Sequence, residues 1–466
     1  MVLGGEAKGN DESEEQDALV VLVHQSFNAT DDDTRIDLDD SVESIPDLKT
    51  LSQPTNVQRT FSIIATGSEV VEHFNRNGKP LLRLSQSDKM KSNKSSNSHE
   101  KTSDPLSHSQ IRHSPRGDAF KHPVQHFDVA KVHTVSEALD AFNATSFQSR
   151  LLGKCYKIWL NMLNDPNRPI IFFGLSGAMI AGGMRRLLRD LIAFHAIDAL
   201  VSTGANLSHD LYESLGGRHY MAQHHIDDPT LRDMRIDRVY DTYADDVVFT
   251  EADEFVENFA TTLEPRGYSS REFFQLMGQR INDEHGILST AAREHLPVFC
   301  PALADSSIGM ALTVYRNEQL KKERAPMVYD PMLDNLEIMS LKRRWQKSGV
   351  IFIGGGTPKN YIQQVIPMAE IAGMAVPPHS YAIQVTTDDP KWGGLSGCEL
   401  PESQSWGKLD ANAQQCTVYV DATIGLPLLF TGVMEHYEEW KGRGRLEYNW
   451  EEPLNASVPK ARKVSA

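Results

Sequence analysis

One lysine in this chain lies in surroundings that could let it act as a nucleophile. Lys408 ends the stretch Ser403-Gln404-Ser405-Trp406-Gly407-Lys408. Trp406 can shield the amine, Gly407 lets backbone approach closely, and Glu402 supplies a nearby carboxylate. These surroundings suit an amine that must at times be unprotonated, as an imine-forming lysine must be. Taken alone, the same residues also fit a solvated lysine after a turn, which is the commoner situation.

Several apolar runs end in small residues that could receive a phosphate. These ends cover residues 174–178, 202–206, 305–309, 354–357 and 386–388. Backbone amides and helix N-termini approach phosphates closely at such strand ends. None of the five is a dinucleotide fingerprint or a P-loop lysine motif, and each alone fits a tight turn. Together they favour a nucleotide site.

Two kinds of side chain near these ends could serve that site. Asp305 and Asp421 could hold ribose hydroxyls, although each alone fits a helix cap. His209 follows the 202–206 end and could act as a general base or cap its helix. His224 and His225 precede Asp227 and favour a polar loop, because adjacent histidines converge poorly on one ion. We expect no metal site.

The segments that must position these residues read as alternating strands and helices. Continuous apolar runs are typical of strands covered on both faces, hence of a parallel sheet. The runs are 170–174, 199–203, 297–301, 350–354, 381–386 and 417–421. Helix-like spacing recurs over 151–162 and 180–192, and Ser269 with Glu272 forms a capping box before another helix. The pattern predicts a doubly wound α/β fold: a mostly parallel, Rossmann-like sheet with helices on both faces.

Composition excludes several classes of protein. The 466 residues carry a formal net charge of −16, which argues against nucleic acid as the main partner. The four cysteines are widely spaced with no CxxC pair and are expected to be reduced thiols. The first residues lack a signal peptide, and no apolar segment is long enough to span a bilayer. We expect a soluble, cytoplasmic protein that does not enter membranes.

The chain is expected to contain three parts. Residues 1–128 form a low-complexity N-terminal extension, largely disordered or loosely structured, in which the tract 85–113 should be mobile because it lacks core-forming residues. The apolar runs 18–23 and 61–64 could add strands or bind a partner. Residues 129–450 form the catalytic domain, and 451–466 form a C-terminal tail.

Three motifs together carry a family resemblance. They are Ser-Trp-Gly-Lys at 405–408 with Val-Tyr-Val-Asp-Ala at 418–422, Pro-Ala-Leu-Ala-Asp-Ser-Ser-Ile-Gly at 301–309, and Ile-Gly-Gly-Gly-Thr-Pro-Lys at 353–359. In order and spacing, the chain from about Ala144 to Tyr437 resembles deoxyhypusine synthase. The resemblance implies that NAD takes hydride from spermidine and that 1,3-diaminopropane leaves. The aminobutyl group then passes through an imine on Lys408 to a lysine of the hypusine-containing translation factor.

The resemblance also implies roles for individual residues. Glu402 and Trp406 fall at spermidine positions, Asn360 follows the glycine run, and His209 is the second catalytic candidate beside Lys408. The cofactor positions, taken from the resemblance and from the strand ends, are Ser176, Gly177, Thr203, Gly204, Ala205, Asp305, Gly354, Thr387, Asp388, Asp421 and Ala422. Sites in the family lie between subunits of a tetramer, so we expect a homo-tetramer or a hetero-tetramer with a paralogue.

The chain departs from the family pattern at several of these positions. Asn360 stands where spermidine-using members usually have histidine, His209 where they have glutamate, and Met310 and Leu395 where they place carboxylates. Gly177 and Ala178 replace a Ser-Asn cofactor contact. This pattern resembles the deoxyhypusine-synthase-like branch. It leaves open transfer to a small diamine, as in homospermidine synthesis, or a subunit that is active only with a paralogous partner.

Overall fold

The computed structural model describes residues 120–222 and 226–450 in full, and the backbone of four short strands between residues 19 and 83. Contacts divide the chain into two units, Met1–Ser107 and His108–Ala466, which are described separately. The tract 85–113 that we expect to be mobile lies outside the described residues. The tail 451–466, His224 and His225 also lie outside them.

The first unit contains a four-stranded antiparallel sheet of order β1-β2-β3-β4. Its strands are β1 (Leu19–His24), β2 (Thr60–Ala65), β3 (Glu72–Phe74) and β4 (Pro80–Arg83). In the pairing of β1 with β2, Leu19 lies opposite Ala65. The apolar runs 18–23 and 61–64 therefore form strands that pair with each other.

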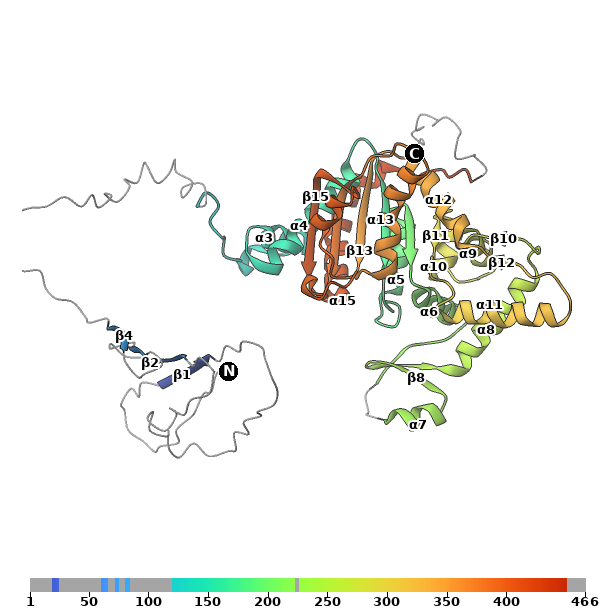
Figure 1. Ribbon diagram of the computed structural model, residues 1–466, viewed down its shortest axis with the longest axis horizontal. Coiled ribbons are helices and arrows are strands. Elements are labelled where there is room, and N and C mark those ends of the chain that lie inside the picture. Colours follow the sequence, from blue (N-terminus) through green and yellow to red (C-terminus); the bar gives the residue numbers. More distant parts are fainter. Residues whose placement is uncertain are drawn as a thin grey trace, which may run out of the picture. The chain divides into compact units, whose positions relative to one another are not determined.

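The second unit is built on a six-stranded parallel sheet of order β11-β6-β5-β13-β14-β15 (Figure 1). Its strands are β5 (Ile170–Leu175), β6 (Ala199–Ser202), β11 (Val298–Phe299), β13 (Ser348–Ile353), β14 (His379–Thr386) and β15 (Leu409–Tyr419). Each of the six predicted runs falls on one of these strands. The last strand begins earlier than its apolar run, because residues 410–415 are polar or small and carry no buried-strand signal.

Alternate residues of each strand enter two separate cores. Phe173 and Ile351 pack in the core that includes α4, α5 and α15. Phe172 and Val350 pack in the core that includes α12 and α13. Both faces of the sheet are therefore covered, which is why the strands read as continuous apolar runs. The predicted doubly wound α/β fold is confirmed.

The helices of the second unit follow the strands in alternation. They are α3 (Val135–Asn143), α4 (Phe147–Asn164), α5 (Arg185–Ala193), α6 (Gly204–Ser214), α7 (Asp228–Asp233), α8 (Asp246–Thr261), α9 (Ser270–Gly278), α10 (Ile287–Arg293), α11 (Ser307–Lys321), α12 (Pro331–Arg344), α13 (Gly356–Ile371), α14 (Leu400–Ser405), α15 (Ala422–Met434) and α16 (Tyr437–Trp440). Short 3-10 helices cover Val129–Lys131, Pro390–Trp392 and Lys441–Arg443. None of the described helices is long and apolar enough to cross a membrane.

Two small sheets complete the second unit. Strands β7 (Tyr220–Met221), β9 (Thr242–Asp245) and β8 (Ile236–Val239) pair antiparallel and project with α7 away from the main sheet (Figure 1). Strands β10 (Gly267–Tyr268) and β12 (Val328–Tyr329) pair in parallel. No apolar run predicts these strands, because their residues are mostly exposed or half-buried.

Two predicted helix starts differ in detail. Helix α5 begins at Arg185 and not at 180, after Gly183 adopts a φ of 82° that interrupts the helix. Helix α9 begins after Ser269, whose side chain accepts from the Glu272 amide as predicted. The Glu272 carboxylate does not return to the Ser269 amide, because it pairs with Arg266 at 2.6 Å. The capping box is therefore half formed.

Candidate active site

Four of the predicted site residues line one cavity. The cavity has a volume of about 720 Å³ and lies along α13, α14 and the loop after β14. Lys408, Glu402, Trp406 and Asn360 all contribute to its wall. The other lining residues are Gln363, Gln364, Pro367, Met368, Ile371, Pro390, Gly393, Gly394, Leu395, Cys398 and Ser403. The residues predicted to hold a polyamine and to form an imine therefore share one pocket, which we call the lysine pocket.

The backbone holds Lys408 between α14 and the sheet. Helix α14 ends at Ser405, and Gly407 then takes a φ of 69°, a conformation that favours glycine. This turn returns the chain so that the Lys408 amide donates to the Ser403 carbonyl at 3.0 Å. The Lys408 carbonyl accepts from the His379 amide at 3.1 Å, at the start of β14. Lys408 is fixed on both sides of its peptide unit.

The amine of Lys408 is partly shielded from water. Its Nζ lies 5.5 Å from the centre of the Trp406 ring, a distance that permits a cation–π contact. Burial lowers the pKa of Lys408, while Cys398 and Glu402 act in the opposite direction. Trp406 itself is 67% exposed. Within one chain, the indole therefore covers one side of the amine and leaves its own outer face to solvent.

A second lysine, Lys359, holds the loop that lines this pocket. Lys359 is fully buried, and its Nζ donates to Gln384 Oε1 at 3.0 Å and to the Cys398 carbonyl. The same Gln384 side chain donates to the carbonyls of Gly354 at 2.9 Å and Ser396 at 2.8 Å. Burial lowers the pKa of Lys359, and the Lys408 charge lowers it further. This network joins the glycine turn after β13 to the loop that lines the lysine pocket.

The predicted cofactor residues lie along one edge of the sheet. Because the six strands are parallel, their carboxyl ends all lie at this edge. Ser176 and Gly177 follow β5, Thr203, Gly204 and Ala205 follow β6, Asp305 follows β11, Gly354 follows β13, Thr387 and Asp388 follow β14, and Asp421 and Ala422 follow β15. We call this edge the carboxyl edge.

The direction of winding reverses between β5 and β13. The α5 helix that follows β5 packs in one core, whereas the α13 helix that follows β13 packs in the other. Such a switch point opens a crevice that binds ligands in doubly wound folds. The turns after β5 and β13 meet there, since Ser176 donates from its amide to the Ile353 carbonyl at 3.0 Å and from Oγ to the Gly355 carbonyl.

Two helices begin at the carboxyl edge without a side-chain hydrogen bond from their own N-cap residues, which are Thr203 for α6 and Gly355 for α13. At the start of α13 the Gly356 amide donates to Ser396 Oγ at 3.0 Å. The first-turn amides of both helices are the groups that bind phosphates elsewhere. A Cβ on Gly355 would lie 2.4 Å from the Ser396 Cα, so this turn needs glycine for close backbone approach.

The two candidate ribose ligands differ in their local partners. Asp421 is the N-cap of α15, and its Oδ1 accepts from the Thr423 amide at 2.8 Å. Asp305 does not cap a helix, because Ser306 caps α11, and its side chain is exposed. Asp421 therefore caps its helix through Oδ1, and its Oδ2 takes no part in that cap.

His209 does not cap a helix. It lies in the middle of α6, one turn after Ala205 and on the same face of the helix. Its ring packs edge-on against Phe249 at 5.3 Å, and Nδ1 lies 2.8 Å from His219 Nε2. Burial lowers the pKa of His209 to about 4, with a further contribution from His219. The ring is therefore neutral near pH 7. It lies on the same face of α6 as Ala205, which is at the carboxyl edge.

Within one chain, Lys408 and the ribose candidate Asp421 lie at opposite ends of β15. Lys408 precedes the first residue of β15, and Asp421 follows its end. Leu409 and Tyr419 pair with His379 and Thr386 of β14, which are about 23 Å apart at about 3.3 Å per residue. The lysine pocket and the far end of the carboxyl edge are thus separated by the length of a strand.

Comparison with known proteins identifies the family. The family model for deoxyhypusine synthase matches residues 137–433. The chain is 42% identical over 332 residues to a probable deoxyhypusine synthase 2 of Methanosarcina acetivorans, covering 70% of this chain and 94% of the relative. It is 38% identical over 331 residues to a deoxyhypusine synthase-like protein of Coxiella burnetii, covering 70% and 92%. The chain therefore belongs to the deoxyhypusine synthase family.

Proposed function

We propose that this protein is an NAD-dependent aminobutyltransferase. It takes the aminobutyl group of spermidine, carries it as an imine on Lys408, and passes it to a lysine of the hypusine-containing translation factor. The observation that carries the proposal is the half-buried Lys408 amine in a cavity beside Trp406 and Glu402, in a chain of this family.

Lys408 is the proposed nucleophile. An ordinary lysine has a pKa of about 10.4, so that well under about one amine in a thousand is unprotonated at neutral pH. Burial lowers the pKa of Lys408 and raises the fraction that can attack an imine carbon. A cationic polyamine entering the pocket would lower it further.

Glu402, Trp406 and Asn360 are the proposed polyamine contacts. Among the lining residues, which all belong to the described part of the chain, Glu402 is the one carboxylate. A carboxylate can hold one ammonium end, and a flat indole can pack along an alkyl chain. Leu395 lines the same wall where a second carboxylate would be expected. Each lost charge-assisted hydrogen bond is worth about 1–3 kcal/mol, so we expect weaker polyamine binding than two or three carboxylates would give.

NAD is the proposed cofactor, and the residues at the carboxyl edge fit it. The first-turn amides of α6 and α13 would hold the pyrophosphate, and Asp305 and Asp421 would hold ribose hydroxyls. Ser176, Gly177 and Gly354 line the switch point, and Thr387, Asp388 and Ala422 continue the edge. When bound, NAD supplies the acceptor for the hydride that leaves the carbon next to the secondary amine of spermidine.

His209 is the proposed general base. Oxidation of an amine at its α-carbon requires the nitrogen lone pair, so an ammonium must first lose a proton. His209 is neutral near pH 7 and follows Ala205 on the same face of α6. It can therefore accept that proton near the carboxyl edge.

A second copy of the chain would complete the site. The lysine pocket and the far end of the carboxyl edge lie at opposite ends of β15. Two copies packed with one carboxyl edge against the other's lysine pocket would join them without moving either element. This arrangement supports a homo-tetramer, or a hetero-tetramer in which a paralogue contributes one half.

A small diamine is the second candidate acceptor. Leu395 and Asn360 line the pocket where a carboxylate and a histidine are expected for spermidine-using members, and this departure is the observation that leaves a small diamine as a second candidate. The two functions differ in product. Protein transfer labels the translation factor with radioactive spermidine, whereas diamine transfer converts putrescine to homospermidine.

The test is an assay of the purified full chain with NAD and spermidine. Release of 1,3-diaminopropane supports the shared first step, and the labelled product then identifies the acceptor. Absence of 1,3-diaminopropane both alone and with a cellular paralogue would contradict the proposal.

A further inference from the structure

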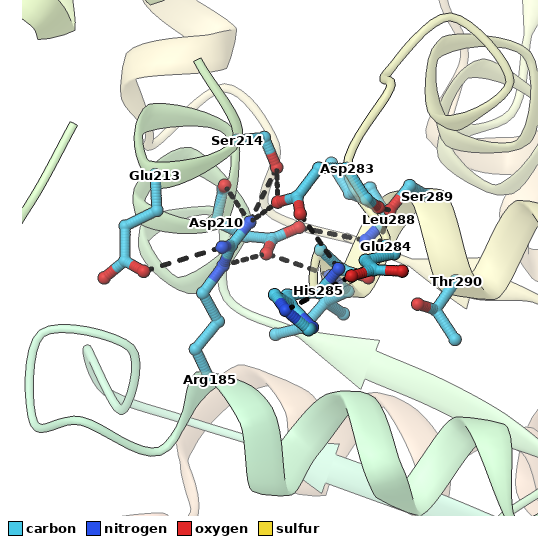
Figure 2. Close-up of polar contacts among 12 residues, drawn as sticks. Arg185, Asp210, Glu213, Ser214, Asp283, Glu284, His285, Leu288, Ser289 and Thr290 are labelled. Atoms are coloured by element: carbon cyan, nitrogen blue, oxygen red, sulfur yellow. Dashed lines mark hydrogen bonds and ion pairs between the residues drawn. The ribbon is translucent and has the colours of Figure 1, made fainter. Parts of the chain in front are cut away.

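A line of polar contacts runs from His209 to a buried ion cluster. His209 Nδ1 lies 2.8 Å from His219 Nε2, and His219 Nδ1 lies 2.7 Å from Glu213 Oε1. The other carboxylate oxygen of Glu213 lies 3.5 Å from Arg185 Nη1. Figure 2 shows Glu213 on one side of the Arg185 guanidinium group and Asp283 on the other. Four side chains thus form one connected series.

The far end of this series is rigidly held. Arg185 contacts Asp210 at 2.8 Å and Asp283 at 2.6 Å. Asp210 is fully buried and also accepts from the amides of Ile287 and Leu288, each at 2.9 Å, at the start of α10. Arg185 therefore keeps two carboxylate partners even without Glu213. A change at Glu213 should leave this cluster folded.

When both rings are neutral, the contacts fix which nitrogen of each ring carries the proton. The Glu213 carboxylate can only accept, so His219 must donate from Nδ1. A neutral His219 then has its lone pair at Nε2 and can only accept there. His209 must in turn donate from Nδ1, which leaves the lone pair of a neutral His209 at Nε2.

We infer that His219 and Glu213 are positioning residues that hold His209 as an Nδ1–H tautomer with an unprotonated Nε2. The inference rests on the proposed function for the identity of the substrate amine. In the step that follows, an N–H bond of the substrate ammonium breaks, an Nε2–H bond forms on His209, and the electron pair stays on the amine nitrogen. Within the series, Glu213 is the group whose charge favours the positive charge gained by His209.

Three further observations agree with this role. Among residues 120–222 and 226–450, the hydrogen bond of the His209 ring is the one at Nδ1 with His219, and it leaves Nε2 outside the series. His219 is 7% exposed, which keeps water from competing for its two bonds. The rings of Phe249 and Tyr212 stack on each other and pack against His209 and His219, respectively, which fixes both planes.

Neutron diffraction tests the proton positions directly. The full-length protein, crystallised in D2O near pH 7.5, should show deuterium at Nδ1 of both His209 and His219 and none at Nε2 of either. Deuterium at His209 Nε2, with His219 carrying two, would mean that His219 is the charged donor and would overturn the inference. This result does not depend on whether the protein turns over spermidine.

Kinetics test whether the series acts in the reaction. Glu213→Gln and His219→Asn should each lower kcat for 1,3-diaminopropane release by about 100-fold or more, a typical contribution of a general base. KM for spermidine and the affinity for NAD should stay within about twofold. His436→Asn is the matched control, because His436 Nδ1 contacts Glu439 at 2.7 Å on α16, away from the site. It should keep wild-type kcat.

The outcomes separate the two claims. An unchanged kcat in Glu213→Gln, or a loss of NAD affinity equal to the loss of kcat, would show that the series is only structural. A wild-type protein with the expected deuterium pattern but no activity on any polyamine would refute the proposed function and leave the positioning of His209 intact.

Discussion

At the scale of single residues, the proposed chemistry depends on the amine of Lys408. Lys408→Arg keeps a positive charge at this position but removes the nucleophile, because a guanidinium group is not deprotonated in proteins. We expect no aminobutyl transfer and unchanged NAD affinity. Borohydride reduction in the presence of NAD and spermidine, followed by peptide mass spectrometry, should find the adduct on wild-type Lys408. Full transfer activity in the arginine variant would rule out the covalent route.

The sequence predicted four residues of the lysine pocket but not the buried lysine, Lys359, that supports it. Lys408, Glu402 and Trp406 lie within seven residues, so their proximity follows from local chain geometry. The burial of Lys359 depends on Gln384 and the Cys398 carbonyl, which are 25 and 39 residues away. Its position after the glycine run was visible in the sequence, but the partners that bury it were not.

Asp421 shows a different kind of miss. The sequence analysis treated a helix cap and a ribose ligand as alternatives. The geometry makes them compatible, because the cap uses Oδ1 alone.

At the scale of elements, the glycine turn before α13 links the carboxyl edge to the lysine pocket. Gly355→Ala would place its Cβ 2.4 Å from the Ser396 backbone, which cannot move without displacing the pocket loop. We expect the free energy of unfolding to fall by about 1–3 kcal/mol, as for other overpacked sites. The affinity for NAD should fall as well. Denaturant titration and NAD titration measure the two effects.

Gly442→Ala provides the control for this turn. An added Cβ at Gly442 meets no atom within 4 Å, and its φ is not in the left-handed region. It should change neither quantity. Equal behaviour of the two alanine variants would mean that the close approach at Gly355 does not constrain the turn.

The main elements could be predicted because burial on both faces leaves a strong signal. The six strands of the sheet each gave a continuous apolar run, and α4 gave a helical pattern. The projecting strands β7, β8 and β9 are mostly exposed or half-buried, so no apolar pattern marks them. The first half of β15 was not predicted, for the same reason. The candidate role of His209 was visible in the sequence, but its contact with His219 was not, since His219 lies in the segment after α6.

At the scale of the whole molecule, the separation of Lys408 from the far end of the carboxyl edge predicts complementation between variants. Lys408→Arg removes the lysine pocket's nucleophile, and His209→Gln removes the base at the carboxyl edge. If the halves come from different copies, refolding the two inactive variants together should restore about a quarter of wild-type activity by random pairing. Activity that stays at the background of the separate variants would place both halves of the site in one chain.

Stability of the whole unit should also depend on pH through a buried histidine. His379 is fully buried, and burial, with Lys342 nearby, lowers its pKa to about 3. The unfolded chain binds the proton more readily, so stability is lost as pH falls from 6.5 towards 3. Between pH 6.5 and 5 the loss should be about 2 kcal/mol for this one group.

His379→Asn isolates this contribution. Urea titrations between pH 7.5 and 5 should show a shallower decline for the variant than for the wild type. Asp334, whose pKa burial raises to about 6, acts in the opposite direction, but it is present in both proteins and cancels in the comparison. Parallel declines would mean that His379 does not remain neutral in the folded protein.

The irregular start of β15 bears on how this chain could change over evolution. His379 pairs with Leu409 and Tyr381 with Gln414, so β15 contains more residues than β14 between these two pairs. The surplus segment is fastened to α14, because Gln404 donates to the carbonyls of Asp410 at 2.8 Å and Ala411 at 3.2 Å. Insertions or deletions in this segment would change the position and direction of the Lys408 side chain, while the pairing register of the rest of β15 with β14 stayed the same. The position of Lys408 can therefore diverge through the length of this segment, independently of the carboxyl edge.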